Sequence, residues 1–421
     1  MGRWGVAAGL VVLALTGAAK ASPFRPYLVG ARAAGMGGAY TALADDGSGA
    51  YYNAGGLAFV ETSQLSLAAS VYGRASGSIK DALGDGHDFE FSNLNAFPMA
   101  TAAVWKLDDA DVLAVHAFVP DSQHINDRDQ LVLAENAFFE VQDQQTIWVG
   151  ATFARRFGRL GVGASGFLLI GSGSALADLT LTVPGSNPPQ FGTLTVRTDQ
   201  TVLGLVGAVG LRWDATDQLH FGASLFSPEV GLGDGSRSLF ARVATPSGIQ
   251  VANVQDLHAG PTLPLRAQLG AAWSEGPWTF SVDAMLLAAR ETVDDADRPS
   301  YTRRFVRNLV VNASAGGEYV AFGMWPLRAG FFTDFDASPE VFDQPPGSPG
   351  NGSSNGEHAD RFGGSFSVGL RTEHTSSDLG LNLAFAHGKS LEARNFDFND
   401  LVARDLSEFD LYVFIASAYR F

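Results

Sequence analysis

Apolar and polar residues alternate along much of the chain with a period of two, which is the pattern of a β-strand whose two faces meet different surroundings. Between residues 265 and 274, Leu269 and Trp273 fall on one face, while Arg266 and Gln268 fall on the other. The same alternation recurs through the rest of the chain, with large apolar side chains on one face and small or polar ones on the other. Such faces suit a wall with lipid outside and a polar lumen inside.

The alternating segments are numerous enough for roughly 14 strands, an even number as in bacterial single-chain barrels. Their links alternate in length, as the short link at 158–159 and the long link at 228–263 illustrate. Short periplasmic turns and long external loops are the rule for such barrels. We therefore predict an all-β fold, a transmembrane antiparallel β-barrel with both chain ends in the periplasm. The expected strands lie near 62–73, 97–106, 111–119, 145–157, 160–170, 199–213, 219–227, 264–274, 278–289, 309–320, 326–334, 361–373, 378–388 and 409–421.

The last expected strand ends in an aromatic residue. Counting back from Phe421, the residues Tyr419, Ile415, Val413 and Leu411 share its face. A terminal aromatic on such a strand is the feature that the outer-membrane assembly machinery recognises. The sequence therefore predicts an integral protein of the bacterial outer membrane, whose partners include this machinery and the surrounding lipid.

The first 21 residues read as a signal peptide. Arg3 supplies a short positive start, residues 5–18 are apolar or small, and Ala19-Lys20-Ala21 is a small-x-small cleavage pattern. We expect cleavage after Ala21. The chain contains no cysteine, which excludes a lipoprotein anchor and any disulfide framework.

Composition supports the same class. The chain is 46% hydrophobic and only 17% charged, although no later stretch has 18 consecutive apolar residues. A closed barrel satisfies every backbone polar group in lipid without such a stretch. A soluble periplasmic β-protein is the alternative. The net charge of −16 at pH 7 argues against nucleic acid as a partner, because nucleic acid requires clustered Lys and Arg.

Residues 22–60 do not alternate. They are rich in Gly, Ala and Tyr and carry few charges, which favours a compact plug inside the barrel over a disordered arm. We therefore divide the chain into a signal peptide at 1–21, an N-terminal hatch at 22–60 and a barrel at 61–421.

The hatch resembles that of the FadL long-chain fatty acid transporter family. That family reads G-x-G-x-A-x, then A-D-D, then N-P-A-x-L, and this chain has the related segments in the same order at 30–40, 44–46 and 52–57. The family's Asn-Pro-Ala is Asn53-Ala54-Gly55 here, and the loss of proline makes this turn less rigid. Weaker similarities occur at 118–120, 263–266 and 326–331.

The resemblance implies a 14-stranded barrel plugged by its N-terminus that takes up hydrophobic compounds passively, long-chain fatty acids or other apolar molecules. It further implies a pocket above the hatch and a sideways exit through a gap at a kink in the third strand. The kink corresponds to Phe118 and Pro120 here, with Pro120 ending the strand because proline cannot donate a ladder hydrogen bond. The resemblance also implies hatch or gate residues, namely Gly35, Gly37, Asp45, Asp46, Asn53, Ala54 and Gly55.

Two sets of residues are candidate ligand contacts. Within 127–142, Leu131 and Phe138 recur at helical spacing, which predicts a helix that either forms the lip of a capture groove or only packs on its neighbours. Arg266, Arg328 and Arg371 fall on expected lumen faces. Each is a suitable partner for a fatty-acid carboxylate. Each could equally pair with lumen acids such as Asp283.

No cofactor, metal site or enzyme activity is predicted. Asp45-Asp46-Gly47-Ser48 lacks the further ligands that calcium needs, and a turn is the simpler reading. The alternative function is a non-transport barrel of the same superfamily that acts as a secretion-machinery partner, as PorV-like proteins do. An outer-membrane lipid hydrolase ranks last, because no His on an expected lipid face stands opposite a Ser.

Overall fold

In this computed structural model, the structure describes residues 28–82, 88–131, 136–182, 190–346, 354–393 and 400–421. The predicted signal peptide at 1–21 lies outside the described residues. The side chains of Leu131 and Phe138, the expected capture contacts, also lie outside the described part.

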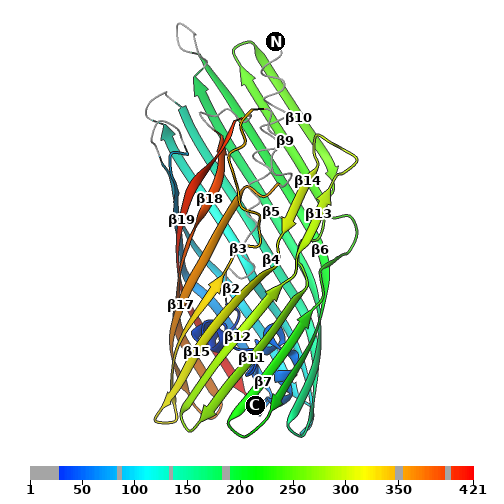
Figure 1. Cartoon of the computed structure of the whole chain (residues 1–421), viewed down its shortest axis with the longest axis vertical. Coiled ribbons are helices and arrows are strands. Elements are labelled where there is room, and N and C mark those ends of the chain that lie inside the picture. Colours follow the sequence, from blue (N-terminus) through cyan, green and yellow to red (C-terminus); the bar gives the residue numbers. More distant parts are fainter. Residues whose placement is uncertain (1–27, 83–87, 132–135, 183–189, 347–353, 394–399) are drawn as a thin grey trace.

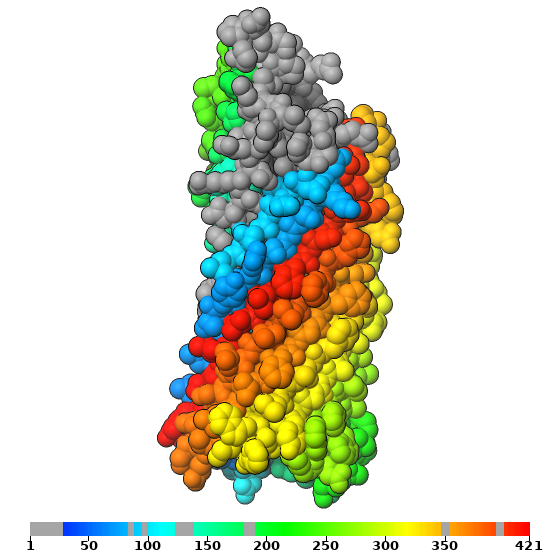
Figure 2. Space-filling model, turned by 90° about the vertical axis from the view of Figure 1, so that its left-hand side faces the viewer, coloured from blue at the N-terminus to red at the C-terminus, as the bar shows by residue number. Residues whose placement is uncertain are grey.

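The described chain forms a closed antiparallel barrel of 14 strands, which confirms the predicted architecture. It closes where β1 pairs with β19, and Figure 2 shows these first and last strands side by side, in blue and red. The barrel strands are β1 (Gln64–Ile79), β2 (Phe89–Lys106), β3 (Asp111–Leu131), β4 (Asn136–Phe157), β5 (Leu160–Thr182), β6 (Phe191–Asp214), β7 (Leu219–Phe226), β11 (Arg266–Glu275), β12 (Trp278–Leu287), β15 (Val310–Ala321), β16 (Trp325–Asp334), β17 (Glu357–Arg371), β18 (Thr375–Ala393) and β19 (Leu401–Arg420).

Short turns gather at one end of the barrel and longer connections at the other, here named the turn end and the loop end (Figure 1). The loop end carries further strands. Between β7 and β11, β8 and β9 pair with β6, and β10 pairs with β9, while β13 and β14 form a separate hairpin. These additions are β8 (Val230–Gly231), β9 (Ser236–Thr245), β10 (Gly248–Leu257), β13 (Arg290–Asp294) and β14 (Arg303–Arg307).

The helix expected within 127–142 is wrong. β3 and β4 instead continue as a hairpin, with paired residues from Asp121 and Thr146 up to Leu131 and Asn136. The spacing of apolar residues depends only on the local sequence, whereas the partners for backbone hydrogen bonds come from the neighbouring strands. The strands from β3 through β6 extend together, and their pairing satisfies the backbone groups that a helix would satisfy internally. The wall that they form therefore rises higher than the rest of the barrel (Figure 1).

The predicted faces of the strands are confirmed. On β11, Leu269 is 65% exposed on the outer surface, whereas Arg266 and Gln268 are buried inside. Aromatic side chains also lie exposed where strands meet the turns, a girdle typical of barrels at a membrane interface. They are Trp105, Phe157, Trp213, Phe221, Trp273, Trp278, Trp325 and Tyr419. No helix in the described residues is long and apolar enough to cross a membrane.

Residues 28–60, here called the hatch, fill the lumen near the turn end, drawn in dark blue in Figure 1. The hatch contains short helical segments rather than strands, because each must fit against a curved wall. They are α2 (Ala31–Gly35), α3 (Gly49–Tyr52) and the 3₁₀ helix η1 (Ala54–Phe59). Nearly every hatch side chain is buried, so the hatch and the surrounding strands share one core.

A charge on the outer face should cost insertion energy. Val282 lies on β12 and is 56% exposed on the outer surface. Val282→Arg is expected to destabilise the folded barrel in lipid vesicles by about 2–4 kcal/mol, measured by urea unfolding. The matched control is Ile249→Arg on β10, beyond the barrel wall and similarly exposed, which should change little. Equal stability of the two variants would contradict this placement of the lipid belt.

Candidate functional site

Arg32 ties the hatch to the barrel wall through partly buried ion pairs. Its Nη1 lies 2.6 Å from Asp45 Oδ1 within the hatch, and its Nη2 lies 3.0 Å from Glu318 Oε1 on β15. On the other side of the hatch, Arg212 Nη1 on β6 lies 3.6 Å from Asp45 Oδ2. The same Arg212 atom donates a hydrogen bond to the Leu43 carbonyl. Asp45 thus joins opposite walls of the barrel.

The chain of charges continues along the wall. Arg328 Nε on β16 lies 2.6 Å from Glu318 Oε2, and Arg328 also pairs with Asp378 on β18. At the far end, Arg212 Nε lies 3.0 Å from Asp214 Oδ1. An uninterrupted series of ion pairs therefore runs from β18 through the hatch to β6. Arg328 is engaged by wall carboxylates, which is the structural alternative that the sequence left open.

Arg266 also serves the hatch. Its guanidinium carbon lies 3.7 Å from the centre of the Phe226 ring and 4.7 Å from that of the Tyr51 ring. Its Nη2 donates a hydrogen bond of 3.1 Å to the Tyr51 carbonyl. Stacking on aromatic faces is a favoured environment for a buried guanidinium. Arg266 therefore positions α3, and Asp283, the suggested partner for such arginines, instead accepts hydrogen bonds from the hatch amides of Tyr40 and Thr41.

Asn53 fastens the turn that carries the family-like motif. Its side-chain oxygen accepts a hydrogen bond from Gly55 N at 3.0 Å. Its Nδ2 donates to the carbonyls of Thr41 at 2.7 Å and Leu211 at 2.8 Å. Asn53 is fully buried and has an extended backbone, with φ −159° and ψ 104°. The motif thus joins two hatch segments to β6 even though Ala54 stands where the family has proline.

Small residues of the lumen wall make room for the hatch. A Cβ added to Gly330 would lie 2.2 Å from the hatch nitrogen of Gly37. Gly37 itself has φ +65°, a conformation that glycine adopts without strain. The Ser365 hydroxyl donates to the Gly35 carbonyl at 3.0 Å. Direct contact between the hatch backbone and the wall needs these small side chains.

Asp46 closes a local turn. Its Oδ1 accepts hydrogen bonds from the backbone nitrogen of Ser48 at 2.8 Å and from the Ser48 hydroxyl at 2.6 Å. This is the turn geometry that short acidic side chains favour. In the part of the chain that the structure describes, no group of three potential metal ligands comes together. Asp45 and Asp46 therefore have different tasks, one linking walls and the other shaping the loop.

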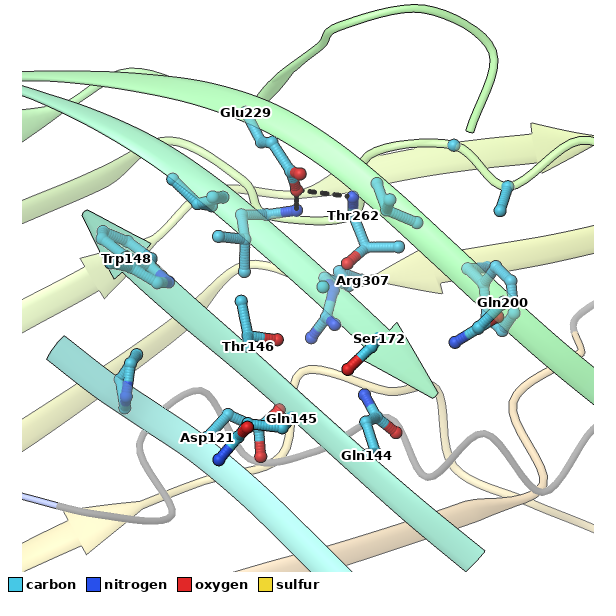
Figure 3. A pocket seen from close by; sticks show the side chains of 18 of the residues that line it. Asp121, Gln144, Gln145, Thr146, Trp148, Ser172, Gln200, Glu229, Thr262 and Arg307 are labelled. Atoms are coloured by element: carbon cyan, nitrogen blue, oxygen red, sulfur yellow. Dashed lines mark hydrogen bonds between the residues drawn. The ribbon is translucent and has the colours of Figure 1, made fainter. Parts of the chain in front are cut away.

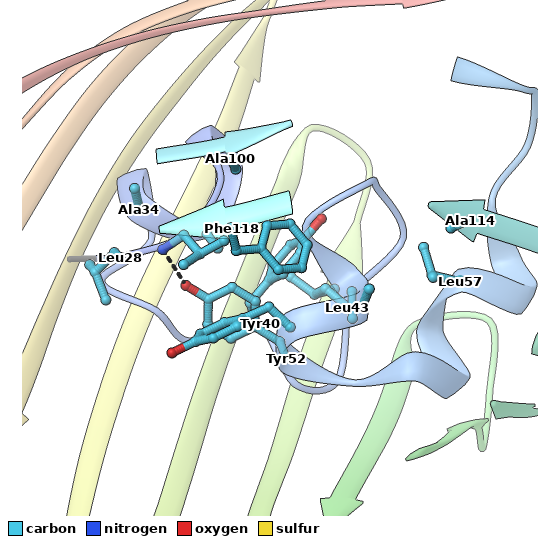
Figure 4. Packing of buried hydrophobic residues seen from close by; sticks show 14 of the residues in the cluster. Leu28, Ala34, Tyr40, Leu43, Tyr52, Leu57, Ala100, Ala114 and Phe118 are labelled. Atoms are coloured by element: carbon cyan, nitrogen blue, oxygen red, sulfur yellow. Dashed lines mark hydrogen bonds between the residues drawn. The ribbon is translucent and has the colours of Figure 1, made fainter. Parts of the chain in front are cut away.

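Aromatic rings form the upper surface of the hatch. Tyr51 makes edge contacts with Tyr52 in the hatch, with Phe118 on β3 and with Trp148 on β4, at centroid distances of 5.3, 5.8 and 5.6 Å. Tyr40 packs edge-on against Tyr52 below them (Figure 4). Such edge-to-face contacts add to the burial of each ring. The hatch thus presents an aromatic floor toward the loop end.

A cavity of about 150 Å³, here called the outer pocket, lies above this floor. Tyr51, Trp148 and Leu169 contribute its apolar lining. Its polar side chains come from β3 to β6 on one wall and from the β13–β14 hairpin on the other (Figure 3). The Glu229 carboxylate at its edge is already hydrogen-bonded, because its Oε2 accepts hydrogen bonds from the backbone nitrogens of Thr262 and Leu263. The pocket is therefore amphipathic.

Arg307 on β14 reaches into the outer pocket (Figure 3). Among the described residues, no carboxylate lies within 4.0 Å of its guanidinium, and no hydrogen bond from its side chain is found. Burial lowers the pKa of Arg307, and the more distant charges of Asp336 and Asp121 oppose this effect. An arginine keeps its proton under such conditions. The pocket thus contains a positive charge whose donors are available to a ligand.

The third strand is kinked beside this pocket. The register between β3 and β4 shifts between Phe118 and Asp121, around Pro120. The expectation that Pro120 ends the strand is wrong, since β3 continues to Leu131. The bulge leaves residue 120 outside the regular pairing, so the ladder does not need the amide hydrogen that proline lacks.

Pairing between β2 and β3 stops at the kink. The described pairs run from Lys106 and Val112 to Ala100 and Phe118, and none is found beyond them toward the loop end. β2 and β3 both continue past this point, each paired on its other side. The wall thus lacks its ladder between these two strands next to the outer pocket.

A second cavity, of about 330 Å³ and here called the turn-end cavity, lies between the hatch and the wall. Its lining comes from the hatch, from β1 and β2, and from β16 to β19. Phe118 lines it, and Tyr51 lines the outer pocket, so the contact between these two rings stands between the cavities. Arg371, the third predicted lumen arginine, faces the turn-end cavity rather than the outer pocket.

The sequence reasoning missed Arg307, Tyr51 and Trp148. Tyr51 precedes the recognised motif, and Trp148 lies on a predicted strand, so both were within reach of the same reasoning. Arg307 was not, because residues 290–308 read as a loop and its side chain enters the pocket only when β14 folds back over the barrel mouth. Residues 303–307 read Arg-Arg-Phe-Val-Arg, which has no period-two alternation, so the sequence contains no signal for this strand.

The Asn53 bonds should dominate the stability of the hatch. Asn53→Ala leaves two buried carbonyls without this donor and is expected to lower stability by on the order of 3 kcal/mol, measured by urea unfolding in vesicles. Ala54→Pro is the contrasting variant. Asn53 is already extended, as a residue before proline prefers, so stability should be kept or raised by about 0.4–1 kcal/mol. A clear loss for Ala54→Pro would contradict this geometry.

No protein-family model matches the chain, and no curated protein matches it. Solved structures do resemble it. A FadL homologue of Pseudomonas aeruginosa has a TM-score of 0.67 at 12% identity, with 95% of this chain and 100% of that chain covered. The toluene transporter TodX of P. putida has a TM-score of 0.62 at 15% identity, with coverages of 95% and 99%. The toluene transporter TbuX of Ralstonia pickettii has a TM-score of 0.59 at 13% identity, with coverages of 93% and 98%. The chain therefore has the fold of the FadL-type channels, a 14-stranded barrel with an N-terminal plug.

Proposed function

We propose that this chain is an outer-membrane channel for the passive uptake of hydrophobic compounds that carry a carboxylate, with long-chain fatty acids as the principal class. The apolar outer surface and the aromatic girdle at the turn end support insertion in a bilayer. Because short turns face the periplasm in such barrels, we expect the turn end, the hatch and both chain ends on that side. The similar structures TodX and TbuX are toluene transporters, which supports a role in transport rather than catalysis.

The observation that carries the proposal is Arg307 in the outer pocket. A cavity of about 150 Å³ has room for a benzene-sized molecule, so neutral hydrocarbons and the head of a fatty acid would both fit. A guanidinium with available donors distinguishes the two classes, because it binds a carboxylate through charge-assisted hydrogen bonds. Tyr51, Trp148 and Leu169 supply an apolar surface for the chain next to the head group. This arrangement favours an amphipathic acid.

The proposed route leaves the barrel sideways. The hatch blocks the lumen below the outer pocket, so a bound molecule cannot continue straight downward while the ion pairs of Arg32 and Asp45 hold. Pro120 and Asp121 line the pocket at the kink, where the ladder between β2 and β3 is interrupted. An apolar tail placed there would meet lipid without breaking backbone hydrogen bonds. Transport then needs only a concentration gradient.

Removing the charge in the pocket should change selectivity. Arg307→Gln is expected to weaken the binding of oleate to purified protein by about tenfold or more, the effect of one lost charge-assisted contact. Binding of a neutral probe such as toluene should stay within about twofold of wild type. Arg304→Gln on the same hairpin is the matched control, because Arg304 is exposed and pairs with Glu291. Equal losses of oleate and toluene would show that Arg307 has a structural role.

The hatch should make the barrel tight. Deleting residues 28–60 removes the aromatic floor and the central ion pairs, and is expected to produce a large, steady conductance in planar bilayers. Wild-type protein should remain closed while cells that produce it take up labelled oleate. Open-porin conductance by the wild type would refute the plugged channel. A closed barrel without uptake of any apolar compound would instead support the secretion-partner alternative.

A further inference from the structure

The turn-end cavity carries an unusual electrostatic environment. Arg371 on β17 lines it, and its Nε is buried without a hydrogen-bond partner. Within the described ranges, neither Arg371 nor Arg420 forms an ion pair, and neither side chain donates a hydrogen bond. Both are cavity-lining cations at the turn end, contributed by β17 and β19.

Four carboxylates line the cavity with the arginines. Asp45 and Asp378 pair with arginines other than Arg371 and Arg420. Asp46 accepts hydrogen bonds from Ser48, and Glu61 is exposed to solvent. Glu318 is shared by Arg32 and Arg328, and Asp378 pairs with Arg328. Arg371 therefore experiences the like charges of Arg32, Arg328 and Arg420, with Glu318 as the opposing carboxylate among its main electrostatic neighbours. Positive charge in a partly enclosed cavity attracts an anion, because screening by water is reduced there.

Neutral donors complete the lining. The Gln64 amide, on the first residue of β1, is buried and makes no hydrogen bond within the described residues. Ser376 on β18 also lines the cavity. Amide, hydroxyl and guanidinium groups are the usual donors to the oxygens of carboxylates and phosphates. The space of about 330 Å³ is more than a small oxyanion requires.

We propose that the turn-end cavity is a binding site for an oxyanion, a carboxylate or phosphate group held by Arg371 and Arg420 with help from Gln64. The site is separate from the outer pocket, because the Tyr51–Phe118 contact and the hatch lie between them. It does not depend on the proposed uptake function. Two sources share this chemistry: a small inorganic anion, or the acid group of an apolar carboxylic acid.

The test uses the purified full-length protein in mild detergent and isothermal titration calorimetry with inorganic phosphate and with octanoate. Arg371→Gln is expected to lower the affinity for the bound probe by about tenfold or more. Arg371→Lys keeps the charge but loses the planar fork, and should fall between wild type and Arg371→Gln. Arg155→Gln is the control, since it removes an exposed arginine near the turn end of β4. A heat-modifiability assay on each variant verifies that the barrel is folded.

The two probes separate the sources. Phosphate binding that requires Arg371 indicates a free anion. Octanoate binding that persists in Arg307→Gln and disappears in the Arg307→Gln/Arg371→Gln double variant indicates an apolar carboxylic acid. Either result supports the site, and the phosphate result does so even if the outer pocket takes no acid. Absence of binding of both probes to wild type, or unchanged affinity in folded Arg371→Gln, would overturn the proposal.

Discussion

The series of ion pairs that runs through Asp45 to the buried Glu318–Arg328 pair is the interaction on which the rest of the molecule depends. A barrel of 14 strands encloses more space than its own lumen-facing side chains fill, so something must occupy the interior. Here the hatch does so, and Arg32, Arg212 and Arg328 fix it between opposite walls. Removing one partner of a buried pair costs about 3–5 kcal/mol, because a charge is left without compensation. The position of the hatch is therefore specified by charge as well as by shape.

This anchoring divides the lumen into two compartments of different character. The outer pocket has an aromatic floor and one available guanidinium, that of Arg307. The turn-end cavity has a polar lining and the available guanidinium groups of Arg371 and Arg420. The division lies at the contact between Tyr51 of the hatch and Phe118 of the wall. Because Arg266 stacks on Tyr51 and donates a hydrogen bond to its carbonyl, the floor is held by this contact as well as by aromatic packing. A ligand could move between the compartments only if this contact opened.

Backbone pairing differs around the wall, and this difference coincides with the division between the two compartments. β3 to β6 are long and fully paired with one another, while β2 and β3 separate above Phe118. A backbone ladder is the main barrier to sideways movement through a barrel, since each broken pair leaves polar groups in lipid. The register shift at Pro120 places the interruption beside the outer pocket and above the hatch. The ion pairs thus close the interior below the level at which the ladder of the wall is interrupted.

The sequence by itself determined the class of fold, the number and order of the strands, and the face that each strand turns outward. These follow from period-two alternation and link length, which are local properties that a barrel must satisfy strand by strand. The sequence also located the hatch, because residues 28–60 lack the alternation. The local sequence did not determine the length of β3 and β4, because that length depends on which neighbouring strand supplies backbone hydrogen-bond partners. The apolar spacing at 127–142 predicted a helix instead.

Only the tertiary structure decided what each charged residue does. Arg266, Arg328 and Arg371 are equivalent in the sequence, each on a lumen face. In the folded barrel, one stacks on Tyr51, one is held by Glu318, and one is left in a cavity. Arg307 becomes a pocket residue because β14 folds over the mouth. Partners of a buried charge come from segments hundreds of residues away, such as Arg32 and Glu318, and alternation within one strand contains no information about them.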